Sequence, residues 1–155
     1  MTHFLLAFCL LTAMVHVPAM VRVPVITLER TACFGSCPVY KLTIFDDGKV
    51  LFDGKDFVKR PGMDTSQIKK SDLEELIRQF EKIDYLNLDE NYTDDPKNCP
   101  QQWTDAPSAI TSFEWKGKKK TIRHYYGCSG SKVAEQLTAL EDKIDEVVNT
   151  NQWIK

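Results

Sequence analysis

The chain has 155 residues, of which 43% are hydrophobic and 27% are charged. This composition is ordinary for one globular domain and unlike that of a disordered or fibrous protein. The 20 basic and 22 acidic residues leave a formal net charge of −2. So small a net charge gives no reason to expect nucleic acid or an anionic membrane surface as a partner.

The N-terminal segment is apolar and uncharged from Phe4 to Val15, and the first charged side chain is Arg22. The length of this segment is typical of the hydrophobic region of a signal peptide, and it is short for a membrane-spanning helix. Val17-Pro18-Ala19 fits a cleavage site. We therefore predict a signal peptide over residues 1–19 and export of a single domain, residues 20–155, to the periplasm, the cell envelope or the medium. The alternatives are an uncleaved segment, which would be the one membrane contact, and a cytosolic chain that buries it.

The segment 23–30 is rich in β-branched residues and predicts a first strand. A hairpin follows over residues 39–52, and the length of its turn decides which side chains share a face. A two-residue loop would place Asp53 opposite Leu42, on the apolar face. A three-residue loop with a left-handed Gly48 places Phe52 there instead, so we predict the three-residue loop.

Two helices and a second hairpin complete the predicted fold. Ser71 begins a capping-box pattern ahead of apolar side chains at one-face helical spacing, and Ser131 precedes a second stripe of this kind. Between the helices lie a polar loop, residues 89–107, and a hairpin over residues 109–126. We therefore predict an α+β fold, in which an antiparallel sheet of about five strands (two hairpins and the N-terminal strand) has two helices packed on one face.

Four cysteines remain once residues 1–19 are removed: Cys33, Cys37, Cys99 and Cys128. An even number in an exported domain predicts disulfides. Of three possible connectivities the most economical is Cys33–Cys37 with Cys99–Cys128, because the first pair shares a short turn and the second hairpin brings its two ends together. The same sulfurs could bind zinc, or Cys33 and Cys37 could be redox-active. The spacing is not typical of either site, and we expect no metal and no cofactor.

His124 and Asp105 are the weak candidates for catalysis. His124 is the one histidine left after cleavage, so a histidine-based relay would need it, and Asp105 could serve as its acid or base. A strand histidine is more often a packed core residue, and an aspartate before Ala-Pro more often caps a turn. The candidate binding surface comprises Arg30, Phe34, Tyr40, Trp103 and Asp105.

Several motifs together resemble one family. They are Cys-Phe-Gly-Ser-Cys-Pro-Val-Tyr at 33–40, Asp-Asp-Gly at 46–48, Thr-Asp-Ala-Pro-Ser at 104–108, Lys-Thr-Ile-Arg-His-Tyr at 120–125 and the ending at 144–154. They resemble the domain-of-unknown-function family numbered 6438 over nearly the whole mature chain. The resemblance implies an exported or envelope-associated bacterial domain, sometimes fused to other modules, with no established activity or catalytic residues.

The leading hypothesis is a non-catalytic extracytoplasmic binding module. In it the Cys33 turn and the loop 89–107 form a rigid exposed surface for an envelope protein or a small ligand. The competing hypotheses are a small enzyme that uses Asp105 and His124, and a thiol-redox protein that uses Cys33 and Cys37. The sequence contains no phosphate-binding loop and no nucleophile elbow that would favour an enzyme.

We expect the exported protein to begin at Met20 and to contain two disulfides and no metal. Intact-mass measurement under native, non-reducing conditions, with and without a chelator, reads all three properties. A chain that retains residues 1–19, free thiols at Cys33 and Cys37, or an ion released by the chelator would contradict this prediction.

Overall fold

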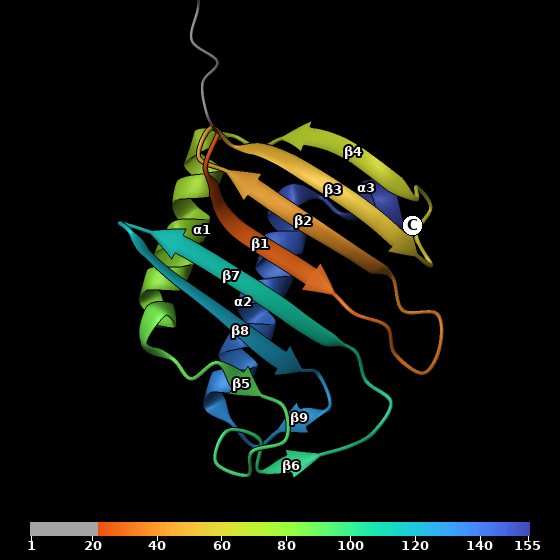
Figure 1. The fold of residues 1–155 in the computed structure, drawn as a ribbon, viewed down its shortest axis with the longest axis vertical. Coiled ribbons are helices and arrows are strands. Elements are labelled where there is room, and N and C mark those ends of the chain that lie inside the picture. Colours follow the sequence, from red (N-terminus) through yellow and green to blue (C-terminus); the bar gives the residue numbers. More distant parts are fainter. Residues whose placement is uncertain (1–21) are drawn as a thin grey trace, which may run out of the picture.

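The computed structural model describes residues 22–155, and the signal-peptide prediction for residues 1–19 lies outside them. A seven-stranded sheet has the order β4-β3-β2-β1-β7-β8-β5 (Figure 1). Its strands are β1 (Pro24–Arg30), β2 (Val39–Phe45), β3 (Lys49–Asp56), β4 (Gly62–Gln67), β5 (Asn91–Tyr92), β7 (Ser108–Trp115) and β8 (Lys118–Tyr125). A separate two-stranded sheet pairs β6 (Gln101–Gln102) with β9 (Cys128–Ser129). The helices are α1 (Lys70–Lys82), the 3-10 helix η1 (Tyr85–Asn87), α2 (Lys132–Val148) and α3 (Asn151–Ile154).

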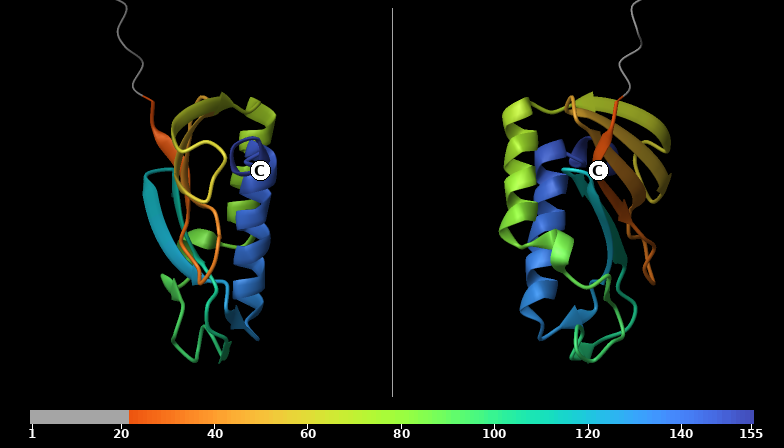
Figure 2. Two further views of the ribbon diagram at one scale, coloured as in Figure 1. Left: turned by 90° about the vertical axis from the view of Figure 1, so that its right-hand side faces the viewer. Right: turned by 60° about the vertical axis from the view of Figure 1, so that its left-hand side comes forward.

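The predicted α+β class is confirmed, with α1 and α2 side by side on one face of the large sheet (Figure 2). The sheet is antiparallel except where β5 pairs in parallel with β8. It has more strands than the five expected. The additional β4 reads Gly-Met-Asp-Thr-Ser-Gln, and β5 has only two residues. Neither segment shows the alternating apolar pattern by which a sequence reveals a strand.

The register of the first hairpin is the one predicted from its three-residue loop. Leu42 lies opposite Phe52, so both apolar side chains face the helices. Gly48 has φ +78°, and a Cβ there would lie 2.7 Å from the carbonyl oxygen of Ile68. The turn therefore requires glycine both for its backbone conformation and for space.

The predicted capping box of the first helix is wrong, because α1 begins at Lys70 and Ser71 lies inside it. The amides of Asp72 and Leu73 donate to the carbonyl of Lys69, which is the N-cap, two residues before the predicted one. By contrast, the Ser131 hydroxyl does accept from an amide of the first turn of α2. Within residues 22–155 none of the helices combines the length and the apolarity needed to cross a membrane.

Stacked aromatic rings fill the space between the sheet and the helices. Phe80 of α1 stacks on Phe113 of β7 at a centroid distance of 4.4 Å. Trp153 of α3 stacks on Phe52 of β3 at 4.6 Å, and its indole N–H donates to Asp64 on β4. The short C-terminal helix thus closes the core over the β3–β4 end of the sheet.

Replacing Trp153 by alanine is expected to lower the free energy of unfolding by about 3–5 kcal/mol, because a fully buried aromatic ring leaves a large cavity. Urea unfolding followed by circular dichroism measures this loss. The matched control is Trp103→Ala, which removes an exposed indole and is expected to stay within about 0.5 kcal/mol of the parent protein. Equal losses in the two variants would contradict the buried packing of Trp153 on Phe52.

Candidate functional site

One row of the sheet beneath α2 is mostly polar, whereas the next row on the same face contains Leu42, Leu28, Thr111 and Ile122. The strand registers pair Tyr40 with Arg30, Arg30 with Ala109, and Ala109 with His124. Partners in register lie on the same face of a sheet. Three residues singled out from the sequence, Arg30, Tyr40 and His124, therefore lie in one line across four strands.

Two carboxylates of α2 project onto this row. Glu141 and Asp145 are four residues apart, which places them on the same face of the helix. Glu141 is fully buried, and the Asp145 side chain is mostly buried. Carboxylates removed from water in this way need ion pairs or hydrogen bonds to be tolerated.

Asp145 is held by Arg30 and Tyr40. Its Oδ2 accepts from Arg30 Nη2 at 2.7 Å and from Arg30 Nε at 3.1 Å. Its Oδ1 accepts from the Tyr40 hydroxyl at 2.7 Å. Both carboxylate oxygens are thus satisfied, and the first two sheet strands are joined to the C-terminal half of α2.

Glu141 is held by the other side of the row. Its Oε2 accepts from the Tyr126 hydroxyl at 2.8 Å and lies 3.1 Å from His124 Nδ1. Its Oε1 accepts from Thr111 Oγ1 at 3.4 Å. Arg30 Nη1 donates to the Tyr126 hydroxyl, and its guanidinium lies 5.0 Å from the centre of that ring, so the two halves form one network.

Burial and the neighbouring charges shift the pKa values of Arg30, Tyr40 and Tyr126. Burial, and then the Asp145 carboxylate, raises the pKa of Tyr40, while burial and Glu141 raise the pKa of Tyr126. Burial alone would lower the pKa of Arg30, but Asp145 and the two phenols outweigh it and raise that pKa. At neutral pH the phenols therefore stay protonated as donors and the guanidinium stays charged.

Two disulfides fix the loops at the end of the sheet where this network lies. They join Cys33 to Cys37 and Cys99 to Cys128, the two pairs that the spacing favoured. The sulfurs required by the zinc and redox hypotheses are thus paired with one another in this structure. No group of three or more His, Cys, Asp or Glu side chains within residues 22–155 is placed to hold a metal ion. A redox role for Cys33 and Cys37 stays a prediction.

The connections β1–β2 and β6–β7 lie at one end of the sheet (Figure 1). They meet where the Phe34 amide donates to the Asp105 carbonyl at 3.3 Å. Phe34 is 89% exposed and Trp103 is 55% exposed. We call these two connections, residues 31–38 and 103–107, the stapled surface.

The structure gives Asp105 and His124 different partners. The Asp105 carboxylate is exposed and accepts from Thr104 Oγ1 at 3.0 Å, whereas His124 is buried against Glu141. Asp105 also has φ +73°, in keeping with an aspartate that shapes a turn. An acid–base role for this pair stays a prediction.

Two pockets flank the stapled surface, and Thr31 lines both of them. One, of about 200 Å³, is lined mainly by apolar atoms and borders the buried network at Arg30 and Tyr40. The other, of about 380 Å³, is more polar and includes Arg123 and Tyr125 of β8. Only the second reaches the size of roughly 300–1,000 Å³ typical of small-molecule sites.

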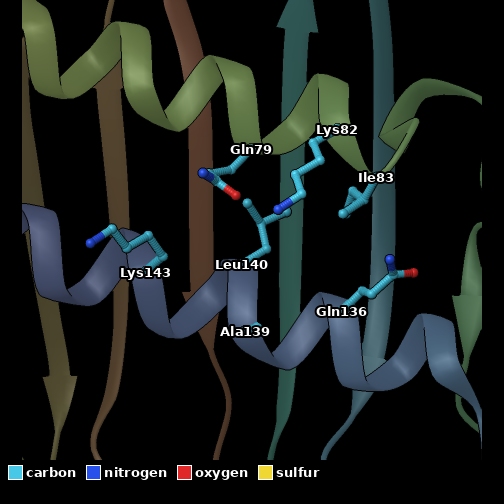
Figure 3. Close-up of a pocket in the computed structure, with 7 residues that line it drawn as sticks. All are labelled: Gln79, Lys82, Ile83, Gln136, Ala139, Leu140 and Lys143. Atoms are coloured by element: carbon cyan, nitrogen blue, oxygen red, sulfur yellow. The ribbon is translucent and has the colours of Figure 1, made fainter.

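A third hollow lies between α1 and α2 and has a volume of about 170 Å³ (Figure 3). Leu140 and Ile83 contribute apolar surface, and Lys82 and Lys143 extend from opposite helices. None of the residues singled out from the sequence lines it. Its small size is that of a gap left where two helices pack.

Sequence reasoning missed Glu141, Asp145 and Tyr126. A signal for the first was present, because Glu141 lies between Leu137 and Ile144 at helical spacing and so interrupts an apolar stripe. Asp145 follows four residues later. Tyr126 carried no such signal, because its position depends on how the chain turns after β8.

Comparison with protein families gives a match over most of the chain. The family described as "Domain of unknown function (DUF6438)" matches residues 24–148. This span runs from the first residue of β1 to the last residue of α2 and so includes the whole buried network. No curated protein matches the chain.

Replacing Asp145 by asparagine is expected to lower the free energy of unfolding by about 3–5 kcal/mol, because Arg30 would lose its buried carboxylate partner. Chemical denaturation measures this change. The matched control is Asp142→Asn, which removes the other carboxylate that contacts Arg30 at 3.2 Å but is 64% exposed. It is expected to cost at most about 1 kcal/mol. Similar losses for the two variants would mean that the buried pair is not the stronger one.

Proposed function

The chain belongs to the DUF6438 family, and we propose that it is an exported, non-catalytic binding module whose recognition site is the stapled surface. The observation that carries this proposal is the display of Phe34 and Trp103. Both are large aromatic side chains exposed on loops that meet each other and are fixed by covalent or hydrogen-bonded staples.

The staples reduce the entropy that binding would otherwise cost. Phe34 lies within the ring closed by the Cys33–Cys37 disulfide. The Trp103 amide donates to the Gly127 carbonyl at 3.0 Å, and its own carbonyl accepts from the Tyr125 hydroxyl at 2.8 Å. Aromatic side chains on a backbone that is already fixed add no backbone-ordering cost to binding, and such side chains are frequent energetic centres of interfaces.

The buried network supports a scaffold role more than a chemical one. Both oxygens of Glu141 and of Asp145 have partners within the protein. Burial raises the pKa values of Tyr40 and Tyr126, which opposes their use as bases near neutral pH. The carboxylates and phenols of this network therefore serve to join α2 to the sheet.

Export is supported by the disulfides and by the apolar segment that precedes the described residues. Disulfides form and persist in oxidising compartments, and a protein with two of them fits the periplasm, the cell envelope or the medium. An envelope protein or a small envelope ligand is the partner class proposed with this location.

The test compares the parent protein with Phe34→Ala/Trp103→Ala. Each disulfide-bonded protein is immobilised and exposed to the envelope fraction of the host, and retained components are quantified by mass spectrometry. The double variant is expected to lose the specific component by more than about tenfold, since two aromatic anchors are removed.

The matched control is Phe57→Ala/Met63→Ala, which removes two other exposed apolar side chains near the β3–β4 turn. This control is expected to retain the component. Equal retention by all three proteins, or loss in the control alone, would reject the stapled surface as the recognition site.

A further inference from the structure

We propose that the 380 Å³ pocket beside the stapled surface binds a carboxylate group, with Arg123 as its anchor. This inference rests on the proposed function, because Ala32 and Ala106 of the stapled surface form part of the pocket wall. It adds the chemical class of the ligand and the residues that recognise it.

The pocket lies on the face of the sheet opposite the helices. Side chains alternate between the two faces of a strand. Because His124 faces α2, its neighbours Arg123 and Tyr125 face outward. Thr31 and Ser108 alternate in the same way with Arg30 and Ala109, and all four outward residues line the pocket.

Arg123 is the arginine of the described chain without an acidic partner. The other four within residues 22–155 each have a carboxylate within 4.0 Å, in the pairs Arg22–Asp47, Arg30–Asp145, Arg60–Asp64 and Arg78–Glu75. No described carboxylate lies that close to Arg123, although Asp94 lines the same pocket. Its planar guanidinium is therefore available for a ligand, and this group matches a carboxylate with two parallel hydrogen bonds.

Ser108 supplies a second observation. The residue is 6% exposed and lines the pocket. Its hydroxyl makes no hydrogen bond among residues 22–155 and is not one of the fully buried unpartnered atoms, so it is open to solvent. Its backbone is fully used, since its amide donates to Thr31 Oγ1 at 2.8 Å and its carbonyl accepts from the Thr31 amide at 2.9 Å. This hydroxyl is therefore available to pair with a ligand oxygen in the pocket.

Tyr125 and Asp94, which also line the pocket, restrict the kind of carboxylate ligand that it can bind. The Tyr125 hydroxyl already accepts from the Ala106 amide and donates to the Trp103 carbonyl, so Tyr125 contributes a fixed wall. Asp94 adds one negative charge, which disfavours ligands with several negative charges. The pocket therefore suits a single carboxylate with an N–H or O–H donor beside it that can reach Asp94. A peptide C-terminus and an acidic sugar both have this chemistry.

The test uses two pairs of probes that differ only in the acid group. The first pair is N-acetyl-alanyl-alanine and the same dipeptide with a C-terminal amide. The second pair is glucuronic acid and glucose. Binding to the disulfide-bonded protein is followed by titration in NMR spectra. One acid is expected to bind at the resonances of Arg123 and Ser108, while its neutral counterpart does not, and the acid that binds identifies the source of the carboxylate.

Arg123→Gln is expected to weaken binding of that acid by roughly 10- to 100-fold, the range for losing a charge-assisted hydrogen-bonding group. The control Arg78→Gln removes the same charge from the exposed surface of α1 and is expected to bind as the parent does. Asp94→Asn is expected to preserve the site and to relax the selection against ligands with two carboxylates.

The inference is overturned if neither acid binds, if the neutral counterpart binds as well as the acid, or if Arg123→Gln binds like the parent protein. If Phe34→Ala/Trp103→Ala still abolishes partner capture but neither acid binds, the carboxylate site alone is rejected. If an acid binds but those substitutions leave partner capture unchanged, the aromatic recognition site is rejected instead.

Discussion

The removal of Arg30, Glu141 and Asp145 from water is the constraint on which the rest of this structure depends. Charged groups in such surroundings are tolerated only with partners at hydrogen-bonding distance, and the loss of one partner costs several kcal/mol. The network therefore specifies the position of α2 more strictly than an apolar stripe could, because leucines can slide past one another while the Arg30–Asp145 pair and the contacts of Glu141 cannot. Once α2 is fixed, α3 follows and places Trp153 on Phe52.

The same constraint orders the end of the sheet that carries the loops. Arg30 is the last residue of β1, and Tyr40 is the second residue of β2. Both strand ends at the Cys33–Cys37 turn are thus joined to one carboxylate, Asp145. The ends of the exposed loop are fixed by the buried Asp145 contacts, and its base is closed by the Cys33–Cys37 disulfide. These restraints let a short segment present Phe34 in a defined place.

Neighbouring residues of this region serve opposite faces of the sheet. Arg30 and His124 face the helices and satisfy α2, whereas Thr31 and Arg123 face outward and line the polar pocket. A shift of one residue in the register of β1 or β8 would exchange these roles and bury the wrong charge. The buried network thereby sets the register that the outer pocket requires, and scaffold and candidate binding site share the same strands.

The sequence by itself determined the elements whose signals are local. Alternation and the Gly48 turn specified the first hairpin and its register, helical spacing specified the apolar faces of α1 and α2, and the hairpin geometry favoured the disulfide pairs. The polar edge strand β4 and the two-residue strand β5 were not predicted. Their pairing with a neighbouring strand, and not their own sequence pattern, makes them strands.

Only the tertiary structure decided what the polar residues do. Arg30, Tyr40 and His124 were recognisable as unusual, but their partners were not. Asp145 follows Arg30 and Tyr40 by more than 100 residues, and Glu141, which contacts His124, lies on a different element. Whether Arg123 or His124 turns inward likewise depends on which face of β8 the helices cover. Electrostatic partnership is a property of distance and burial, and neither can be read from a sequence until the chain has folded.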